Sequence, residues 1–373
     1  MQFIDLKKQQ KFIRDSLDQR IKEVLDKGQY IGGEEIRLFE SKLSSYSGVK
    51  HSIGCSNGTD AIMLALLALG VKPGDGVITV PFTYIATLEA IAAIGAVPVL
   101  VDVYDSTFNM NPDLIEDAIN KSKIDIKAIM PVDLFGLPAR YRLVNEIAKK
   151  HSLKVVADAA QSFGASKSNQ FVGTFADITT TSFFPAKPLG CYGDGGAVFT
   201  NNNNYNDILR SLAVHGKGSD KYDNIRVGMN SRLDTLQAAI LLEKIKIFKN
   251  EVVLRNEIAN LYRQKLNHIS DITFQTIPKA YESVYAQFSI LFSDETKRNN
   301  VQKYLMNKNI PSVIYYPISG HLQKGYRYLN YQEGDFPVSE ELGKRILSLP
   351  MHPYLEEEQI DRIVRTIEDG LTK

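Results

Sequence analysis

A lysine and an aspartate, each at the end of an apolar run, carry side chains that together can hold a reactive cofactor. Lys187 lies between a Thr-rich apolar run and a Gly-rich turn, and Asp158 ends a shorter apolar run upstream. A carboxylate can bind the nitrogen of a pyridine ring, and a lysine amine can form an imine with an aldehyde, so the pair is the skeleton of a pyridoxal-phosphate site. Each residue alone has a simpler explanation, because most lysines are surface charges and an aspartate after a strand often caps a helix.

A turn that can bind phosphate precedes a helical pattern near residue 60. Gly58 permits an unusual turn there, and Thr59 can cap the helix or donate its hydroxyl to an anion. The free N–H groups and the positive dipole end of a helix N-terminus suit a phosphate. Ser182 can supply a second hydroxyl, unless the backbone already satisfies it. Thr59 alone is better explained as a plain N-cap, and the chain has no GxGxxG after its first strand and no GxxxxGK[ST], so dinucleotide and P-loop sites are weakly supported.

Aromatic and amide side chains near these segments suit the pyridine ring itself. Tyr84 follows an apolar run and can stack on the face of the ring, whereas Phe82 is better explained as a core residue. Gln161 can hydrogen-bond the ring hydroxyl or fix Asp158, and its alternative is a solvent-facing position on a helix. Pairing with Asp158 would keep the ring nitrogen protonated, which makes the ring an electron sink.

Apolar runs and helical patterns alternate between about residues 50 and 200. The runs that predict strands are 77–80, 97–103, 128–134, 154–157, 178–184 and 197–200. Helical patterns lie between several of them, at 60–69, 84–94, 112–120 and 141–151. Strands without polar alternation, separated by helices, indicate an α/β fold with a mainly parallel, mixed sheet covered on both faces. Ligands bind beyond the carboxyl ends of such strands, where Asp158 and residues 182–187 fall.

The remaining patterns predict a second, smaller domain. A helix is expected over 10–27, ending at Gly28, and one long helix over 233–264. Beyond it come strands at 273–275 and 286–292 and helices at 295–306 and 339–345, and the polar run 201–204 is expected to be a turn. A long helix of this kind commonly links two domains. We therefore predict a large cofactor-binding α/β domain over 1–245 and a smaller α+β domain over 246–373.

The composition excludes several classes of protein. The chain has 373 residues and a formal net charge of +1, so no long-range field attracts it to nucleic acid or anionic lipid. Cys55 and Cys191 form no CxxC motif, which suits a reducing cytosol. The six histidines lack metal-ligand spacing, so we expect no metal site. No apolar run reaches membrane-spanning length and no signal peptide is visible, so we expect a cytoplasmic protein.

These segments resemble the DegT/DnrJ/EryC1/StrS sugar aminotransferases, which are fold-type I enzymes that depend on pyridoxal phosphate. The resemblance runs through nearly the whole chain, from residues 3–6 and 29–33 to 349–355. The most specific matching segments are 57–61, 158–162, 182–196 and 228–234. Within the family, the run 187–196 is most similar to bacterial enzymes that aminate C3 of a UDP-linked 3-oxo-N-acetylglucosaminuronate.

The resemblance implies a role for most of the candidate residues in binding the cofactor. It assigns Lys187 as the imine-forming lysine and proton shuttle, Asp158 as the partner of the ring nitrogen and Tyr84 as the ring stacker. It assigns the phosphate contacts to Gly58, Thr59 and Ser182.

The resemblance also implies a homodimer with shared active sites. Asn230 would reach the phosphate of the neighbouring subunit's cofactor, and Arg232 would hold an anionic part of the sugar nucleotide. The substrate cleft would be lined by Gln29, Ile31, Tyr315 and Tyr316. Many relatives have histidine where this chain has Tyr315, so the pyrophosphate or sugar contact at that position is expected to differ.

The implied reaction transfers an amino group to a nucleotide-linked keto sugar, with pyridoxamine phosphate as the intermediate form of the cofactor. By resemblance, glutamate is the donor, UDP-2-acetamido-2-deoxy-3-oxo-glucuronate is the acceptor, and the product enters surface polysaccharide such as the O-antigen of lipopolysaccharide. A dTDP- or UDP-linked 3-keto or 4-keto-6-deoxy sugar remains an alternative. Three other functions are considered: a sugar dehydratase of the same family, a non-catalytic pyridoxal-phosphate-binding regulator, and a nicotinamide oxidoreductase. Lys187 argues against the dehydratase, because those relatives have histidine at this position.

Overall fold

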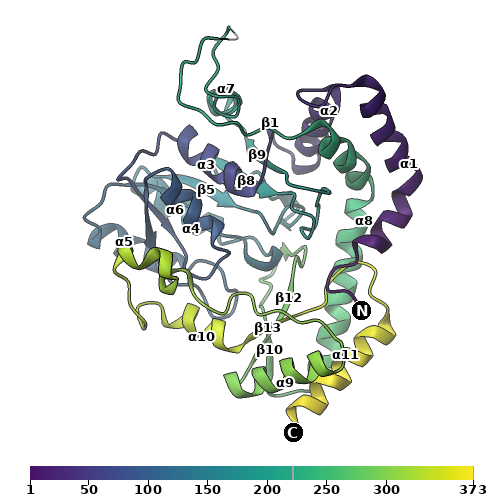
Figure 1. The fold of residues 1–373 in the computed structure, drawn as a ribbon. Coiled ribbons are helices and arrows are strands. Elements are labelled where there is room, and N and C mark those ends of the chain that lie inside the picture. Colours follow the sequence, from purple (N-terminus) through teal and green to yellow (C-terminus); the bar gives the residue numbers. More distant parts are fainter. Residues whose placement is uncertain (221, 373) are drawn as a thin grey trace.

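The computed structural model describes residues 1–220 and 222–372 and is built around a seven-stranded sheet. The strand order is β1-β9-β8-β5-β4-β2-β3, and Figure 1 labels β1, β9, β8 and β5 of this sheet. The strands are β1 (His51–Cys55), β2 (Gly76–Thr79), β3 (Val97–Leu100), β4 (Ile126–Ile129), β5 (Lys154–Asp158), β8 (Ile178–Ser182) and β9 (Gly196–Thr200). Neighbours from β3 to β8 are parallel, while β9 runs antiparallel to both β8 and β1. The predicted mainly parallel, mixed sheet is confirmed.

Both faces of this sheet are buried, which explains why its strands lack polar alternation. Successive residues such as Val77 and Ile78, or Val155 and Val156, belong to separate apolar clusters on opposite faces. One cluster includes residues of α3 (Gly58–Ala68), α4 (Ala86–Ala93) and α7 (Asn203–Leu212). The opposite face is covered by α5 (Ile115–Lys121), α6 (Tyr141–Lys150), α2 (Glu34–Ser47) and the first half of α8 (Thr235–Leu266).

The long helix α8 connects the large sheet to the C-terminal elements, as Figure 1 shows on the right of the molecule. Phe248 packs with the large-sheet residues, whereas Tyr262 stacks on Phe288 at a centroid distance of 4.8 Å. The predicted helix over 233–264 is therefore confirmed. The predicted domain boundary at residue 245 falls inside this continuous helix, and the division into 1–245 and 246–373 stays a prediction.

The C-terminal part is a small antiparallel sheet with helices on it. The sheet has the order β10-β12-β13, with strands β10 (Ile272–Phe274), β12 (Phe288–Phe292) and β13 (Ile346–Leu349). Its helices are α9 (Glu295–Asn307), α10 (Pro337–Arg345) and α11 (Glu357–Leu371). A third, short sheet has the order β11-β6-β7, in which β6 (Ser166–Lys167) pairs on one side with β11 (Tyr281–Glu282) and on the other with β7 (Gln170–Phe171).

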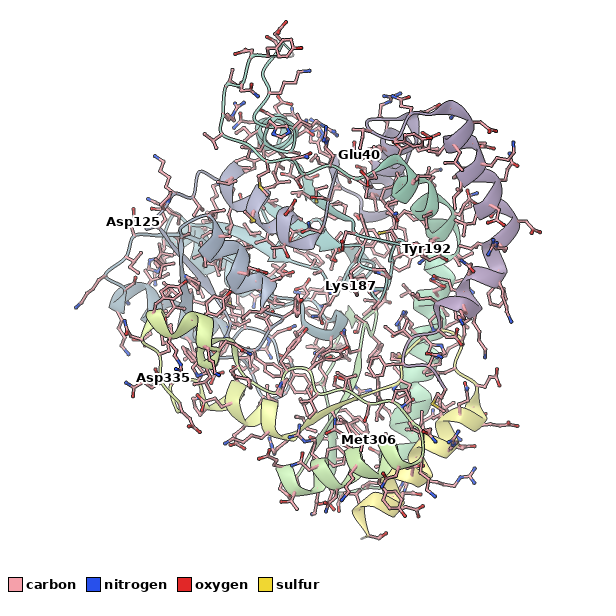
Figure 2. The ribbon with its side chains drawn as sticks, viewed as in Figure 1. Glu40, Asp125, Lys187, Tyr192, Met306 and Asp335 are labelled. Atoms are coloured by element: carbon pink, nitrogen blue, oxygen red, sulfur yellow. The ribbon has the colours of Figure 1, made fainter. Side chains whose placement is uncertain are left out.

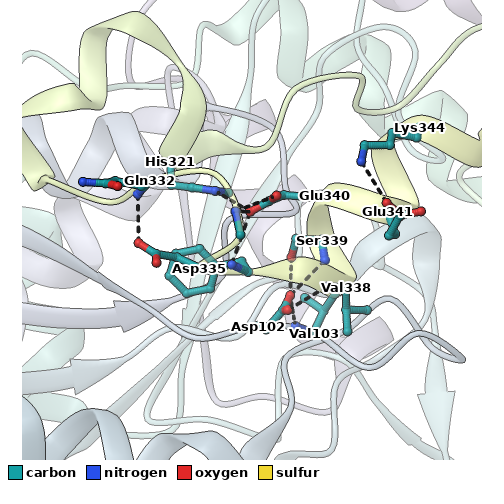
Figure 3. Close-up of polar contacts among 12 residues, drawn as sticks. Asp102, Val103, His321, Gln332, Asp335, Val338, Ser339, Glu340, Glu341 and Lys344 are labelled. Carbon is teal, nitrogen blue, oxygen red and sulfur yellow. Dashed lines mark hydrogen bonds and ion pairs between the residues drawn. The ribbon is translucent and has the colours of Figure 1, made fainter.

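Buried polar contacts fix the C-terminal segment onto the edge of the large sheet. Asp102 lies just after β3 and accepts hydrogen bonds from the backbone N–H groups of Val338 and Ser339 at 2.9 and 3.0 Å (Figure 3). These N–H groups are in the first turn of α10, so the carboxylate caps that helix from a distant part of the chain. Nearby, Nε2 of His321 lies 3.1 Å from the Glu340 carboxylate. That carboxylate also accepts hydrogen bonds from backbone N–H groups of the loop before α10.

Several elements differ from the sequence-based expectations. The helix predicted over 10–27 begins earlier, as α1 (Leu6–Lys27), and ends as expected at Gly28, whose φ is 66°. The predicted turn over 201–204 is wrong, because Asn202 caps α7 by accepting from two backbone N–H groups and α7 begins at Asn203. The patterns did not predict α2, α7, α11, β1 or β13. No helix in residues 1–220 and 222–372 is long and apolar enough to cross a membrane.

Candidate active site

A cavity of about 810 Å³ lies beyond the carboxyl ends of β2, β4, β5 and β8. This is where an α/β sheet places its ligands. Lys187 lies in the middle of the molecule, between the large sheet and the C-terminal elements (Figure 2). The predicted site residues that line the cavity are Gly58, Thr59, Tyr84, Asp158, Gln161, Ser182, Lys187, Tyr315 and Tyr316.

The turn that carries Lys187 holds its amine in a poorly solvated position. The turn begins at the end of β8, and the Lys187 backbone N–H donates to the carbonyl of Phe184 at 2.8 Å. Burial lowers the pKa of Lys187 to about 8, while the nearby Asp158 carboxylate opposes that shift. A larger fraction of this amine is therefore neutral at physiological pH than of an exposed lysine, which suits a nucleophile.

Gly190 allows this turn to close tightly. A Cβ atom at Gly190 would lie 2.5 Å from the carbonyl oxygen of Pro185 and 2.6 Å from that of Phe184. These are the residues that lead into Lys187, so a larger residue at position 190 would displace the backbone on which the lysine stands.

Asp158 ends β5 and faces the same cavity with a side chain that is almost fully buried. Asp158 is 5% exposed. Burial raises the pKa of its carboxyl, while hydrogen bonds and the Lys187 amine oppose the rise. Oδ2 accepts from the Thr87 hydroxyl at 2.7 Å, and Oδ1 accepts from the Ala160 N–H at 3.2 Å. Asp158 is therefore held by its neighbours rather than acting as a solvent-exposed helix cap.

Thr87 is a site residue that the sequence reasoning missed. Its side chain is 1% exposed, lines the cavity and contacts Asp158 directly. The signal was its spacing, because Thr87 lies four residues after Thr83 and three after Tyr84, so all three can share one helical face. The cavity also contains Glu89 and Asp194, which the sequence reasoning left unassigned.

Gln161 and Tyr84 line the cavity, and both lie beside Tyr316. Oε1 of Gln161 accepts from the Phe135 N–H at 2.8 Å, and its Nε2 donates to the Tyr316 hydroxyl at 3.2 Å. Gln161 is buried, so the solvent-facing alternative is wrong. Tyr84 is 56% exposed at the cavity and its ring lies 6.2 Å from that of Tyr316, whereas Phe82 is fully buried in the core as expected.

The N-terminus of α3 forms one end of the cavity. Asn57, not Thr59, caps this helix, because its side chain accepts from the Asp60 N–H at 2.8 Å. The Thr59 hydroxyl makes no hydrogen bond with any described residue, so it remains able to bind a ligand. Gly58 meets β8 so closely that a Cβ atom would lie 2.7 Å from Cβ of Ser182.

Ser182 contributes a second hydroxyl beside this helix end. Its Oγ accepts from the Phe184 N–H at 3.2 Å, and the hydroxyl proton is left for another acceptor. Two hydroxyl groups and the free N–H groups at the start of α3 are a donor set that suits a phosphate.

Four of the predicted site residues lie outside this cavity: Gln29, Ile31, Asn230 and Arg232. Their two segments are neighbours, because Ile31 forms an antiparallel bridge with Asp234. Gln29 and Asn230 are exposed, and Arg232 is partly exposed and forms no ion pair or hydrogen bond with a described residue. The alternative in which Asn230 or Ser231 caps α8 is wrong, because Asp234 is the N-cap residue.

Ser231 connects the 230–232 segment to the chain just before α3. Its hydroxyl lies 3.0 Å from the Ser56 hydroxyl and 3.4 Å from the Ser56 N–H. Ser231 is fully buried, so this contact fixes the segment near the cavity without placing Asn230 or Arg232 inside it.

The charges of the cavity are unbalanced. Among its described lining residues, Lys187 is the only lysine or arginine, while Asp60, Glu89, Asp158 and Asp194 are acidic. A ligand with several phosphates therefore needs cationic contacts from outside this lining. In residues 1–220 and 222–372, no group of three or more His, Cys, Asp or Glu is placed to hold a metal ion.

Comparisons with known proteins agree with this arrangement. The model of the DegT/DnrJ/EryC1/StrS aminotransferase family matches residues 11–368. A UDP-2-acetamido-2-deoxy-3-oxo-D-glucuronate aminotransferase of Pseudomonas aeruginosa is 44% identical over 95% of this chain and 96% of its own length. The crystal structure of a family aminotransferase from Brucella abortus superposes with a TM-score of 0.95 at 45% identity, covering 100% of both chains.

A second solved structure bears on the cofactor. It is a Bacillus subtilis protein with bound cofactor PMP, and it superposes with a TM-score of 0.91 at 32% identity, covering 100% of this chain and 83% of the other. With a family match over nearly its whole length and relatives of this similarity, this chain belongs to the DegT/DnrJ/EryC1/StrS aminotransferase family.

Proposed function

We propose that this chain is a pyridoxal-phosphate-dependent aminotransferase that converts a nucleotide-linked keto sugar to an amino sugar. The observation that carries the proposal is the convergence of Lys187, Asp158 and the N-terminus of α3 on one cavity. An amine of lowered pKa, a buried carboxylate and an anion-binding helix end match the aldehyde, ring nitrogen and phosphate of that cofactor.

The chemistry of the residues suits the cofactor. Gly58 and Ser182 approach so closely that a side chain at position 58 would collide with Ser182, at the helix end that would bind the phosphate. Thr59 and Ser182 each have a hydroxyl proton to donate, and Tyr84 presents an exposed ring to the cavity. Lys187 would hold the aldehyde carbon, Asp158 the ring nitrogen, and Gln161 would hydrogen-bond the ring hydroxyl.

In the proposed reaction, Lys187 would hold the cofactor at rest, and its amine would be free to act as a base and an acid once the amino donor is bound. When bound, the cofactor supplies an electron sink for the charge that forms at the reacting carbon. Beside the reacting carbon, the Lys187 amine would take up and return a proton. Asp158 would hold the ring nitrogen in its protonated form, and the exposed Tyr84 ring would cover one face of the cofactor ring and exclude water from it.

For the substrate, we propose amination at C3 of UDP-2-acetamido-2-deoxy-3-oxo-glucuronate with glutamate as donor. The support is the Pseudomonas aeruginosa relative of that name, together with the matching run at 187–196. Tyr315 and Tyr316 border the cavity and would contact the sugar nucleotide. The product would enter surface polysaccharide such as the O-antigen of lipopolysaccharide, and the enzyme would act in the cytoplasm, which suits its two buried free cysteines.

We further propose a homodimer in which two chains share each active site. Support comes from the cavity itself: among the residues that the structure describes, its lining has one cation, Lys187, which in this proposal holds the cofactor. Arg232 has no partner among the described residues, and Asn230 is exposed beside it. In the dimer, Asn230 would bind the phosphate of the partner's cofactor, Arg232 would bind an anionic group of the sugar nucleotide, and Gln29 and Ile31 would border the cleft.

The proposed substrate is tested with the pyridoxamine form of the full-length protein and a panel of nucleotide sugars. Each sugar is scored by the return of the lysine-bound cofactor absorbance. The UDP-linked 3-oxo-glucuronate should convert the cofactor fastest. Faster conversion by a dTDP-linked 3-keto or a 4-keto-6-deoxy sugar would replace this substrate, and no conversion by any sugar would favour a non-catalytic regulatory protein.

A further inference from the structure

Two threonine hydroxyls form a chain that ends on the carboxylate of Asp158. Oγ1 of Thr87 lies 2.7 Å from Oδ2 of Asp158, and Oγ1 of Thr83 lies 2.9 Å from Oγ1 of Thr87. Thr87 lies in the first turn of α4 and Thr83 lies in the loop that leads into it, and their hydroxyls are in direct contact. All three side chains are buried, which makes each of these hydrogen bonds costly to lose.

The protons of this chain have a fixed direction when Asp158 is ionised. A carboxylate only accepts hydrogen bonds, so the Thr87 hydroxyl donates its one proton to Asp158. Thr87 then accepts from Thr83, which completes the chain. The Ala160 N–H donates to the other carboxylate oxygen, so both oxygens of Asp158 are held.

These contacts oppose the effect of burial on Asp158. Burial favours the neutral acid, whereas the Thr87 hydrogen bond and the Lys187 amine favour the carboxylate. The other titratable groups that interact with Asp158 are Asp133, Tyr141 and Tyr316, and none of them is a cation. Lys187 would change its charge and bonding during the proposed reaction, whereas that reaction makes or breaks no bond to either threonine.

We propose that Thr87, supported by Thr83, is a positioning residue that holds Asp158 ionised and aimed at the ring nitrogen of the cofactor. This inference rests on the proposed function, in which Asp158 pairs with that nitrogen. Thr87 acts through Asp158, so its contribution should be present only when the ring has a nitrogen to pair with.

The test compares pyridoxal phosphate with its 1-deaza analogue, in which carbon replaces the ring nitrogen. Binding to the full-length protein, freed of cofactor, is measured by equilibrium dialysis. Thr87→Val keeps the shape of the side chain and should weaken pyridoxal phosphate binding about 10-fold or more, the scale of one hydrogen bond to a charged group. Binding of the analogue should change less than about 2-fold, because the analogue has no ring nitrogen for Asp158 to pair with and so gains little from the Thr87 hydrogen bond.

Two further variants act as controls. Thr87→Ser keeps the hydroxyl and should bind both compounds like the wild type, and Thr83→Val should show a smaller loss that is again confined to pyridoxal phosphate. Equal weakening of both compounds by Thr87→Val, or no weakening of either, would overturn the inference. If Thr87→Val does not fold, Thr83→Val decides the test by the same criterion.

Asp158→Asn separates failure of this inference from failure of the proposed function. Asp158→Asn should weaken the binding of pyridoxal phosphate, relative to the binding of the analogue, at least as much as Thr87→Val does. If Asp158→Asn discriminates between the two compounds and Thr87→Val does not, only the role of Thr87 is wrong. If neither discriminates, Asp158 does not pair with the ring nitrogen and the inference falls with that assignment.

Discussion

The Ser231 hydroxyl lies 3.0 Å from the Ser56 hydroxyl, which ties the segment before α8 to the turn before α3. The segment therefore has a fixed place beside the cofactor cavity, yet Asn230 and Arg232 do not line that cavity. In the proposed homodimer, these two side chains would complete the site of the partner chain. The proposed shared active site can be tested by mixing variants.

Mixed dimers should recover activity that neither parent variant has. Lys187→Ala dimers should be inactive and Arg232→Ala dimers badly impaired. In a mixed dimer one site collects both defects and the other has neither, so about half of the wild-type activity per mixed dimer should return, by site counting in a two-fold dimer. Turnover is measured after subunit exchange has been demonstrated with tagged chains. Absence of recovery in proven mixed dimers would mean that both residues serve one site from one chain.

Gly58→Ala should damage the phosphate end of the cavity. The added Cβ would lie 2.7 Å from Cβ of Ser182, so β8 and α3 must separate. We expect the free energy of unfolding to fall by about 1–3 kcal/mol, as for an overpacked core, and cofactor affinity to fall as well. Gly325→Ala is the matched control, because its Cβ would meet no atom within 4 Å. Equal behaviour of the two variants would show that the contact between Gly58 and Ser182 is unimportant.

Cofactor capture by the cofactor-free protein should depend on pH through Lys187. Only the neutral amine reacts, and burial lowers the pKa of Lys187 to about 8, so the capture rate should rise with pH and level off above about 8. Asp158 raises this pKa by attraction, so Asp158→Asn should move the midpoint to lower pH. Rates are measured by stopped-flow absorbance. A rate that keeps rising to pH 10 would mean that the amine is solvated like an ordinary lysine.

Asp158→Asn should lower the turnover rate without unfolding the protein. A neutral amide cannot hold the ring nitrogen protonated, so turnover should fall about 10²–10³-fold, the scale for losing one electrostatic contact in an active site. Steady-state kinetics give the rate, and thermal unfolding of the cofactor-free protein checks that the variant is folded. Turnover near the wild-type rate would leave Asp158 with a purely structural role.

Site residues at the ends of strands with a clear apolar pattern could be predicted from the sequence. Lys187 and Asp158 each follow an apolar run that forms a central strand, so both were expected at the same sheet edge. It was harder to predict which of two nearby polar residues caps a helix. Asn57, and not Thr59, is the residue that caps α3. Strand β1 was missed because its short, polar sequence is stabilised by antiparallel pairing with β9, far along the chain.

Contacts between distant segments were beyond the reach of sequence patterns. Thr87 and Asp158 are 71 residues apart, and Ser56 and Ser231 are 175 residues apart. Local periodicity could place Thr87 on the same face as Thr83, but only the sheet order brings that face to the end of β5. The four residues outside the cavity were assigned by family resemblance, and the roles proposed for them require a second chain.

The central claim is that Lys187 holds the cofactor, and borohydride trapping followed by peptide mass spectrometry tests it most directly. Reduction of the full-length protein loaded with pyridoxal phosphate should fix the mass of the reduced cofactor on the peptide that contains Lys187. Lys187→Ala should fold, lose the visible absorbance of the bound cofactor and take up no label. A label on another lysine, or a fully labelled Lys187→Ala protein, would contradict this account.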